Sequence, residues 1–101
     1  MRVRFHPEAR GELRLALGWY YERSPLSATA FAHAVDNAVS RIMKSPNSCP
    51  LADQGARKLV LQRFPFGIFY LTLEAEIVIV AVAHQKRRPG YWSNRVALLI
   101  S

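Results

Sequence analysis

The chain has 101 residues, half of them apolar, and its 14 basic and 7 acidic side chains give a net charge of +7. This length predicts a single domain, residues 1–101, and the apolar content excludes a disordered chain. No stretch approaches the ~20 apolar residues of a membrane span, and the single cysteine, Cys49, excludes an internal disulfide.

Neither a targeting signal nor a cofactor motif stands out in the sequence. The first eight residues contain two arginines, a proline and a glutamate where a signal peptide needs an apolar stretch, so we expect a cytoplasmic protein. There is no glycine-rich phosphate loop and no nucleophile elbow. The three histidines, His6, His33 and His84, are scattered along the chain. We therefore expect neither a metal ion nor another cofactor.

The first two predicted elements are a strand and a helix. Arg2–Phe5 alternates, with Val3 and Phe5 on one side, and predicts a short strand. A helix then begins at Pro7, a residue that suits the first helical position. Its apolar residues recur at helical spacing and form one face: Ala9, Leu13, Ala16, Leu17 and Tyr20.

A second helix is predicted after Ser24-Pro25. Ser24 or Ser27 can serve as its N-cap, and Ser45-Pro46 ends it. The apolar stripe of this helix is Ala28, Phe31, Ala32, Val35, Ala38, Val39 and Ile42. Two helices joined by so short a break predict an antiparallel hairpin.

The apolar pattern then changes from a helical period to a strand period. Residues 46–56 predict a loop, and residues 57–64, 66–73 and 77–84 predict a three-stranded meander. The third strand is apolar at every position from Ile77 to Ala83, as expected for a strand covered on both faces or central in its sheet. This order predicts an α+β fold, with an N-terminal strand and an antiparallel helical hairpin packed on an antiparallel β-sheet.

The positive charge is concentrated in the second half of the chain. Residues 54–73 and 77–101 contain basic side chains and no acidic one. A one-sided positive surface attracts phosphate groups or an acidic protein, and the alternative is a basic face that only aids solubility. The candidate target- or nucleic-acid-binding residues are Arg57, Lys58, Arg63, Lys86, Arg87, Arg88, Tyr91, Trp92 and Arg95. The sequence leaves open which of them meet at one end of the sheet.

The segment after the third meander strand also has groups that a ribonuclease acting by 2′-hydroxyl attack would need. His84 could act as acid or base, and Lys86, Arg87 and Arg88 could hold phosphate. Tyr91 or Trp92 could stack on a base. A second proton-transfer group is not obvious. The alternatives are that His84 bonds to a turn at the strand end and that the two aromatic residues cover the edge of the sheet.

Four segments together resemble the RelE/ParE superfamily of type II toxin–antitoxin toxins: "FHPEARGEL", "WYYERSP", "RFPFGIFY" and "AVAHQKRRPGYWSNR". The resemblance extends from Val3 to about Arg95. It implies a small α+β domain and a growth-inhibiting toxin that is silenced by a cognate antitoxin with a disordered, acidic segment. It also implies contact with operator DNA only through that antitoxin.

The resemblance leaves open which branch of the superfamily the chain belongs to. ParE-like members poison DNA gyrase and are not enzymes, and this hypothesis is favoured by "RFPFGIFY" and "AHQKRRPGYW". RelE-like members cleave mRNA in the ribosome, and under that alternative the catalytic residues would be His84, Lys86, Arg87 and Tyr91. Two basic positions of the RelE-like pattern fall at about Val60 and Gly67, which weakens this alternative. A third possibility is a degenerate, non-toxic member that only binds antitoxin.

Overall fold

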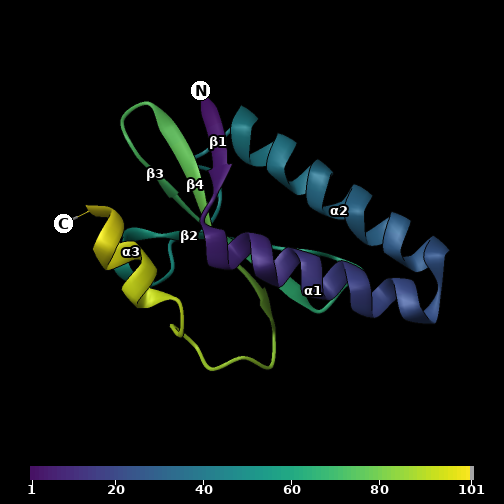
Figure 1. Ribbon diagram of the computed structural model, residues 1–101. Helices are drawn as coiled ribbons and strands as arrows, with labels where there is room; N and C mark the ends of the chain where they lie inside the picture. The colour runs from purple at the N-terminus through teal and green to yellow at the C-terminus, as the bar shows by residue number, and fades with distance from the viewer. Residues whose placement is uncertain (101) are drawn as a thin grey trace.

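The computed structural model describes residues 1–100, so Ser101, the last residue of the predicted domain, lies outside the described part. The elements in chain order are β1 (Arg2–Phe5), α1 (Pro7–Arg23), α2 (Pro25–Lys44), the short 3-10 helix η1 (Asp53–Gly55), β2 (Arg57–Val60), β3 (Phe66–Thr72), β4 (Glu76–His84) and α3 (Ser93–Ile100). The predicted α+β class, first strand, helical hairpin and meander are confirmed (Figure 1). The helix α3 was not predicted.

A single residue joins the two long helices. The backbone N–H of Ser24 donates to the carbonyl of Tyr20 and closes α1, while the Ser24 hydroxyl accepts from the N–H of Ser27 and caps α2. Pro25 occupies the first turn of α2, where its missing N–H costs no helical hydrogen bond. The chain therefore reverses at Ser24, and α1 and α2 lie side by side as a hairpin (Figure 1).

The sheet has the strand order β1-β4-β3-β2. The predicted meander is present, because β2, β3 and β4 pair antiparallel. However, β1 pairs with β4 in parallel, with Val3 opposite Ile77 and Phe5 opposite Ile79, so the sheet is mixed rather than antiparallel throughout. The alternation of apolar residues in β1 does not distinguish parallel from antiparallel pairing, so the sequence could not predict the direction. The connection from β1 to β4 is long enough for the crossover that parallel pairing requires.

The central strand β4 is buried on both faces, as predicted, and a β-bulge sets which residues face each side. Phe69 pairs with Ala81 and Tyr70 pairs with Ile79, so Val80 is an extra residue that shifts the alternation. Ile77, Ile79 and Val82 pack in the core under the helical hairpin, whereas Val78, Val80, Ala81 and Ala83 pack with Trp92 and Val96 on the opposite face.

The second face of the sheet is covered by the C-terminal segment that contains α3. Trp92 and Val96 are buried in its apolar cluster. This helix is only eight residues long and follows a charged loop, so its periodicity is too brief to predict a helix from sequence. None of the helices among residues 1–100 is long and apolar enough to cross a membrane.

The Pro89-Gly90 turn that leads into α3 requires glycine. Gly90 has a φ of 74°, and the N–H of Tyr91 donates to the carbonyl of Arg88, as in a type II turn. A β-carbon on Gly90 would also lie 3.3 Å from Asp53 Oδ2 and from Ser93 Oγ. By contrast, a β-carbon on Gly18 in α1 would meet no atom within 4 Å.

We expect opposite effects of alanine at these two glycines. Gly90→Ala should lower the free energy of unfolding by about 1–2 kcal/mol, because a side chain is strained in the left-handed region. Gly18→Ala should raise it by about 0.5–1 kcal/mol, because alanine loses less entropy in a helix. Urea unfolding of both variants measures the difference. A Gly90→Ala variant as stable as the original chain would contradict this account of the turn.

Candidate functional site

A groove of about 710 Å³ lies on the sheet face opposite the helical hairpin. Its walls are β2, the β2–β3 turn and the long loop between β4 and α3, which is the extended segment leading to α3 in Figure 1. Four exposed basic side chains line it: Lys58, Arg63, Arg87 and Arg88. Among the described residues that line the groove, Asp53 alone is acidic. The groove is therefore strongly positive.

The floor of the groove is aromatic. The ring centroids of Phe69 and Trp92 lie 4.7 Å apart, and Lys58 Nζ lies 5.3 Å from the Phe69 centroid. A β-carbon on Gly67 would lie 3.0 Å from Lys58 Cε. The lysine stem therefore occupies the space above Gly67, and a larger residue at this position of β3 would displace it.

Tyr91 supports the rim of the groove. The guanidinium carbon of Arg87 lies 3.8 Å from the centroid of the Tyr91 ring, a close cation–π stack. The hydroxyl of Tyr91 donates to Glu12 Oε2 at 2.7 Å. The basic rim is thus connected to α1 through one aromatic side chain.

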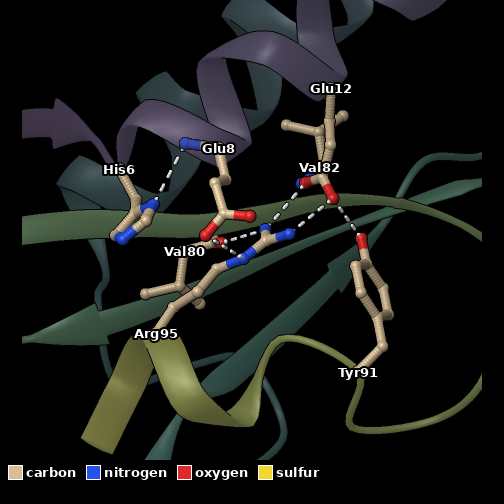
Figure 2. A network of polar contacts seen from close by, with 7 residues as sticks. All are labelled: His6, Glu8, Glu12, Val80, Val82, Tyr91 and Arg95. Atoms are coloured by element: carbon tan, nitrogen blue, oxygen red, sulfur yellow. Dashed lines mark hydrogen bonds and ion pairs between the residues drawn. The ribbon is translucent and has the colours of Figure 1, made fainter. Parts of the chain in front are cut away.

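Glu12 is the centre of a polar network that joins α1, β4 and the C-terminal segment (Figure 2). Its carboxylate accepts four hydrogen bonds, from the N–H of Val82, from Tyr91 and twice from Arg95. Arg95 also donates to the carbonyl of Val80 and lies 3.6 Å from Glu8 Oε2. Each carboxylate oxygen of Glu12 therefore has two donors, which is what a largely buried carboxylate requires.

The network occupies the edge of β4 beyond the end of β1. The last backbone bond to the β1 side runs from the N–H of His6 to the carbonyl of Ile79. Further along β4, Arg95 donates to the carbonyl of Val80 and Glu12 accepts from the N–H of Val82. Two side chains thus supply the bonds that a longer first strand would otherwise make.

The network also raises the pKa values of Tyr91 and Arg95. Burial raises the pKa of the Tyr91 hydroxyl well above its ordinary value, and the hydrogen bond to Glu12 and the charge of that carboxylate raise it further. Burial acts to lower the pKa of Arg95, but the hydrogen bonds and the charge of Glu12 outweigh it, so that the pKa is raised. Tyr91 therefore keeps its proton near neutral pH and is unsuited to act as a base.

The groove brings together most of the residues that the sequence singled out for binding. Those that line it are Lys58, Arg63, Arg87, Arg88, Tyr91 and Trp92. Trp92 is only 2% exposed and so forms the floor rather than a free stacking surface. Arg57 instead donates to the carbonyl of Cys49, Arg95 is held by Glu12, and Lys86 is exposed but is not among the lining residues.

The residues predicted for the nuclease alternative are only partly assembled. His84, Arg87 and Tyr91 line the groove, and Lys86 does not. The Nδ1 atom of His84 accepts from the backbone N–H of Lys86 at 3.0 Å, the contact expected of a histidine that bonds to a turn at a strand end. Among residues 1–100 no group of three or more His, Cys, Asp or Glu side chains could hold a metal ion.

Glu12 and Phe69 were not among the predicted site residues. The signal for Glu12 was present, because it lies between the buried residues Ala9 and Ala16 on the core-facing side of α1, where a carboxylate needs a partner. Its partners lie 70 to 83 residues away, so the sequence did not identify them. Phe69 packs against Trp92 on the sheet face that the C-terminal segment covers, and α3 in that segment was not predicted.

Replacing Glu12 should weaken the fold strongly. Glu12→Ala leaves the nearly buried Arg95 without its main partner, and breaking such a pair from one side costs about 3–5 kcal/mol. Urea unfolding provides the measurement, and Glu22→Ala, at an exposed position of the same helix, is the control with an expected change below about 0.5 kcal/mol. Equal stability of the two variants would contradict the assigned role of Glu12.

Stability should also fall at alkaline pH because of Tyr91. Its pKa is higher in the folded chain than the unfolded value of about 10, so its contribution is complete below that pH and is lost as pH rises through the folded-state pKa. Tyr91→Phe should therefore reduce the decline in unfolding free energy above pH ~10. Burial also raises the pKa of Tyr70, so part of the decline should persist. A decline unchanged by Tyr91→Phe would exclude this contribution.

Comparisons with known proteins identify the family. The family model described as "ParE toxin of type II toxin-antitoxin system, parDE" matches residues 3–89. Among solved structures, a chain of the chromosomal ParDE TA system from P. aeruginosa is similar in fold, with a TM-score of 0.72 and 20% sequence identity over 83% of this chain and 95% of that chain. A search of curated proteins finds no match. Since the family model covers most of the sequence, the chain belongs to the ParE toxin family of type II toxin–antitoxin systems.

Proposed function

We propose that this chain inhibits growth by poisoning DNA gyrase, which it binds through the basic groove. The observation that carries this proposal is the convergence of Lys58, Arg63, Arg87 and Arg88 on one groove with an aromatic floor. Such a surface favours an acidic partner, because a concentrated positive field speeds encounter and restricts orientation. In this proposal the chain acts by binding and performs no chemistry of its own.

The RNA-cleaving alternative finds less support in the groove. The hydroxyl of Tyr91 donates a hydrogen bond to Glu12, and the Nδ1 atom of His84 already accepts one from the backbone N–H of Lys86. Neither group is free to move a proton without first losing its partner. The uncharged residues Val60 and Gly67 also occupy two positions at which the RelE-like pattern has basic residues. Loss of one contact that stabilises the transition state lowers the rate of cleavage by about 10²-fold or more.

The family implies a partner that silences the toxin. We propose an antitoxin of the ParD type whose acidic segment folds onto this positively charged chain and competes with gyrase. A disordered acidic segment suits this role because it can cover a large surface once it orders. Operator DNA would be contacted by the antitoxin and not by this chain.

Charge reversal at the rim should abolish toxicity. The double variant Arg87→Glu/Arg88→Glu turns two attractions into repulsions. Each attraction lost and each repulsion gained changes the binding free energy by roughly 1 kcal/mol, so we expect affinity for gyrase to fall by about 10²- to 10³-fold. The measurement is induced expression without antitoxin, followed by mapping of gyrase-linked DNA breaks and of RNA 5′ ends in the same cells. Breaks should accumulate with the original chain and be absent with the variant.

Arg14→Glu/Lys44→Glu is the matched control, because it changes the net charge equally at exposed positions of α1 and α2. It should remain toxic. Toxicity that survives reversal of Arg87 and Arg88 would exclude the groove as the contact. New cuts in translated messages without DNA breaks would replace this proposal with the nuclease, and normal growth with the original chain would identify a non-toxic member.

A further inference from the structure

Arg87 occupies a particular place on the rim. It is exposed, and it lines both the basic groove and a second cleft of about 360 Å³ between α1 and the end of β4. An exposed arginine ordinarily samples many rotamers, and fixing one of them on binding costs conformational entropy. Here the stack on Tyr91, at 3.8 Å, restricts the guanidinium before any partner arrives.

Three contacts hold Tyr91 in place. Its hydroxyl donates to Glu12, its backbone N–H closes the turn at Arg88, and the guanidinium carbon of Arg95 lies 5.2 Å from its ring centroid. Two arginines thus lie near the ring, and the carboxylate of Glu12 offsets part of their charge. Of these contacts, the hydrogen bond to Glu12 is the one that fixes the outer end of the ring.

We propose that Glu12 and Tyr91 are positioning residues for Arg87. The Glu12–Tyr91 hydrogen bond fixes the ring on which Arg87 stacks, and this stack aims the guanidinium at an acidic group of the target. Arg87 would touch the partner, whereas Glu12 and Tyr91 would act through it. The inference rests on the proposed function only in taking Arg87 as a target contact.

The stack should have a measurable effect on affinity. Immobilising one long side chain at an interface changes affinity by roughly two- to tenfold, and a chain that is already ordered avoids most of this loss. Lysine could not replace Arg87 in this arrangement, because its ammonium group lacks the planar surface that stacks on a ring.

The first test uses the free toxin and does not depend on its target. The order parameter of the Arg87 Nε–H, from ¹⁵N relaxation, reports how firmly the guanidinium is held. Tyr91→Phe keeps the ring and removes only the hydroxyl, and it should lower this order parameter. Tyr21→Phe makes the same chemical change at an exposed tyrosine of α1 and should leave it unchanged. The proposal would be overturned if the order parameter of the Arg87 Nε–H were the same in Tyr91→Phe and in the original chain.

The second test measures inhibition of gyrase supercoiling by the purified chain. Tyr91→Phe and Arg87→Lys should each weaken inhibition by roughly two- to tenfold, and Tyr91→Phe should add nothing when Arg87 is already alanine. The proposal would be overturned if Tyr91→Phe weakened inhibition further in the Arg87→Ala background, or if Arg87→Lys inhibited gyrase as well as the original chain. If the original chain does not inhibit gyrase, the proposed function fails, and the relaxation measurement still decides whether Glu12 and Tyr91 position Arg87.

Discussion

The carboxylate of Glu12 is the constraint on which the geometry of the groove depends. It binds the edge of β4 through Val82, the loop through Tyr91 and the C-terminal helix through Arg95, all from one position on α1. The groove lies on the far side of the sheet from the helical hairpin. The helix α1 on one face of the sheet therefore holds the loop between β4 and α3, which forms a wall of the groove on the other face. The polar network connects these two layers of the fold.

This network contributes more to alignment than to net stability. The attraction between a carboxylate and a guanidinium in the interior largely offsets the cost of removing both from water. The pair instead determines how α1, β4 and α3 are placed relative to one another, because its hydrogen bonds are satisfied in one arrangement of these elements. The apolar clusters on the two faces of the sheet supply the main driving force, and they constrain sliding of these elements less strictly.

The elements set by local chemistry were predictable from sequence, and those set by distant partners were not. Ser24-Pro25 marks the helical hairpin by itself, and the apolar run from Ile77 to Ala83 indicates a strand covered on both faces. The parallel pairing of β1 and the partners of Glu12 depend on residues more than 65 positions away. The groove follows the same rule: its basic residues were evident, but Arg57 and Arg95 are held away from it by bonds to the distant carbonyls of Cys49 and Val80.

The short first strand has a consequence for how other chains can approach. A strand edge with free N–H and C=O groups invites another strand to pair with it, and proteins commonly block such edges with charged side chains. Beyond Phe5 the edge of β4 is blocked in this way, because Arg95 occupies the carbonyl of Val80 and Glu12 occupies the N–H of Val82. This stretch of the β4 edge is therefore protected against edge-to-edge aggregation, and a partner that added a strand there would first have to displace Glu12 from the N–H of Val82 and Arg95 from the carbonyl of Val80.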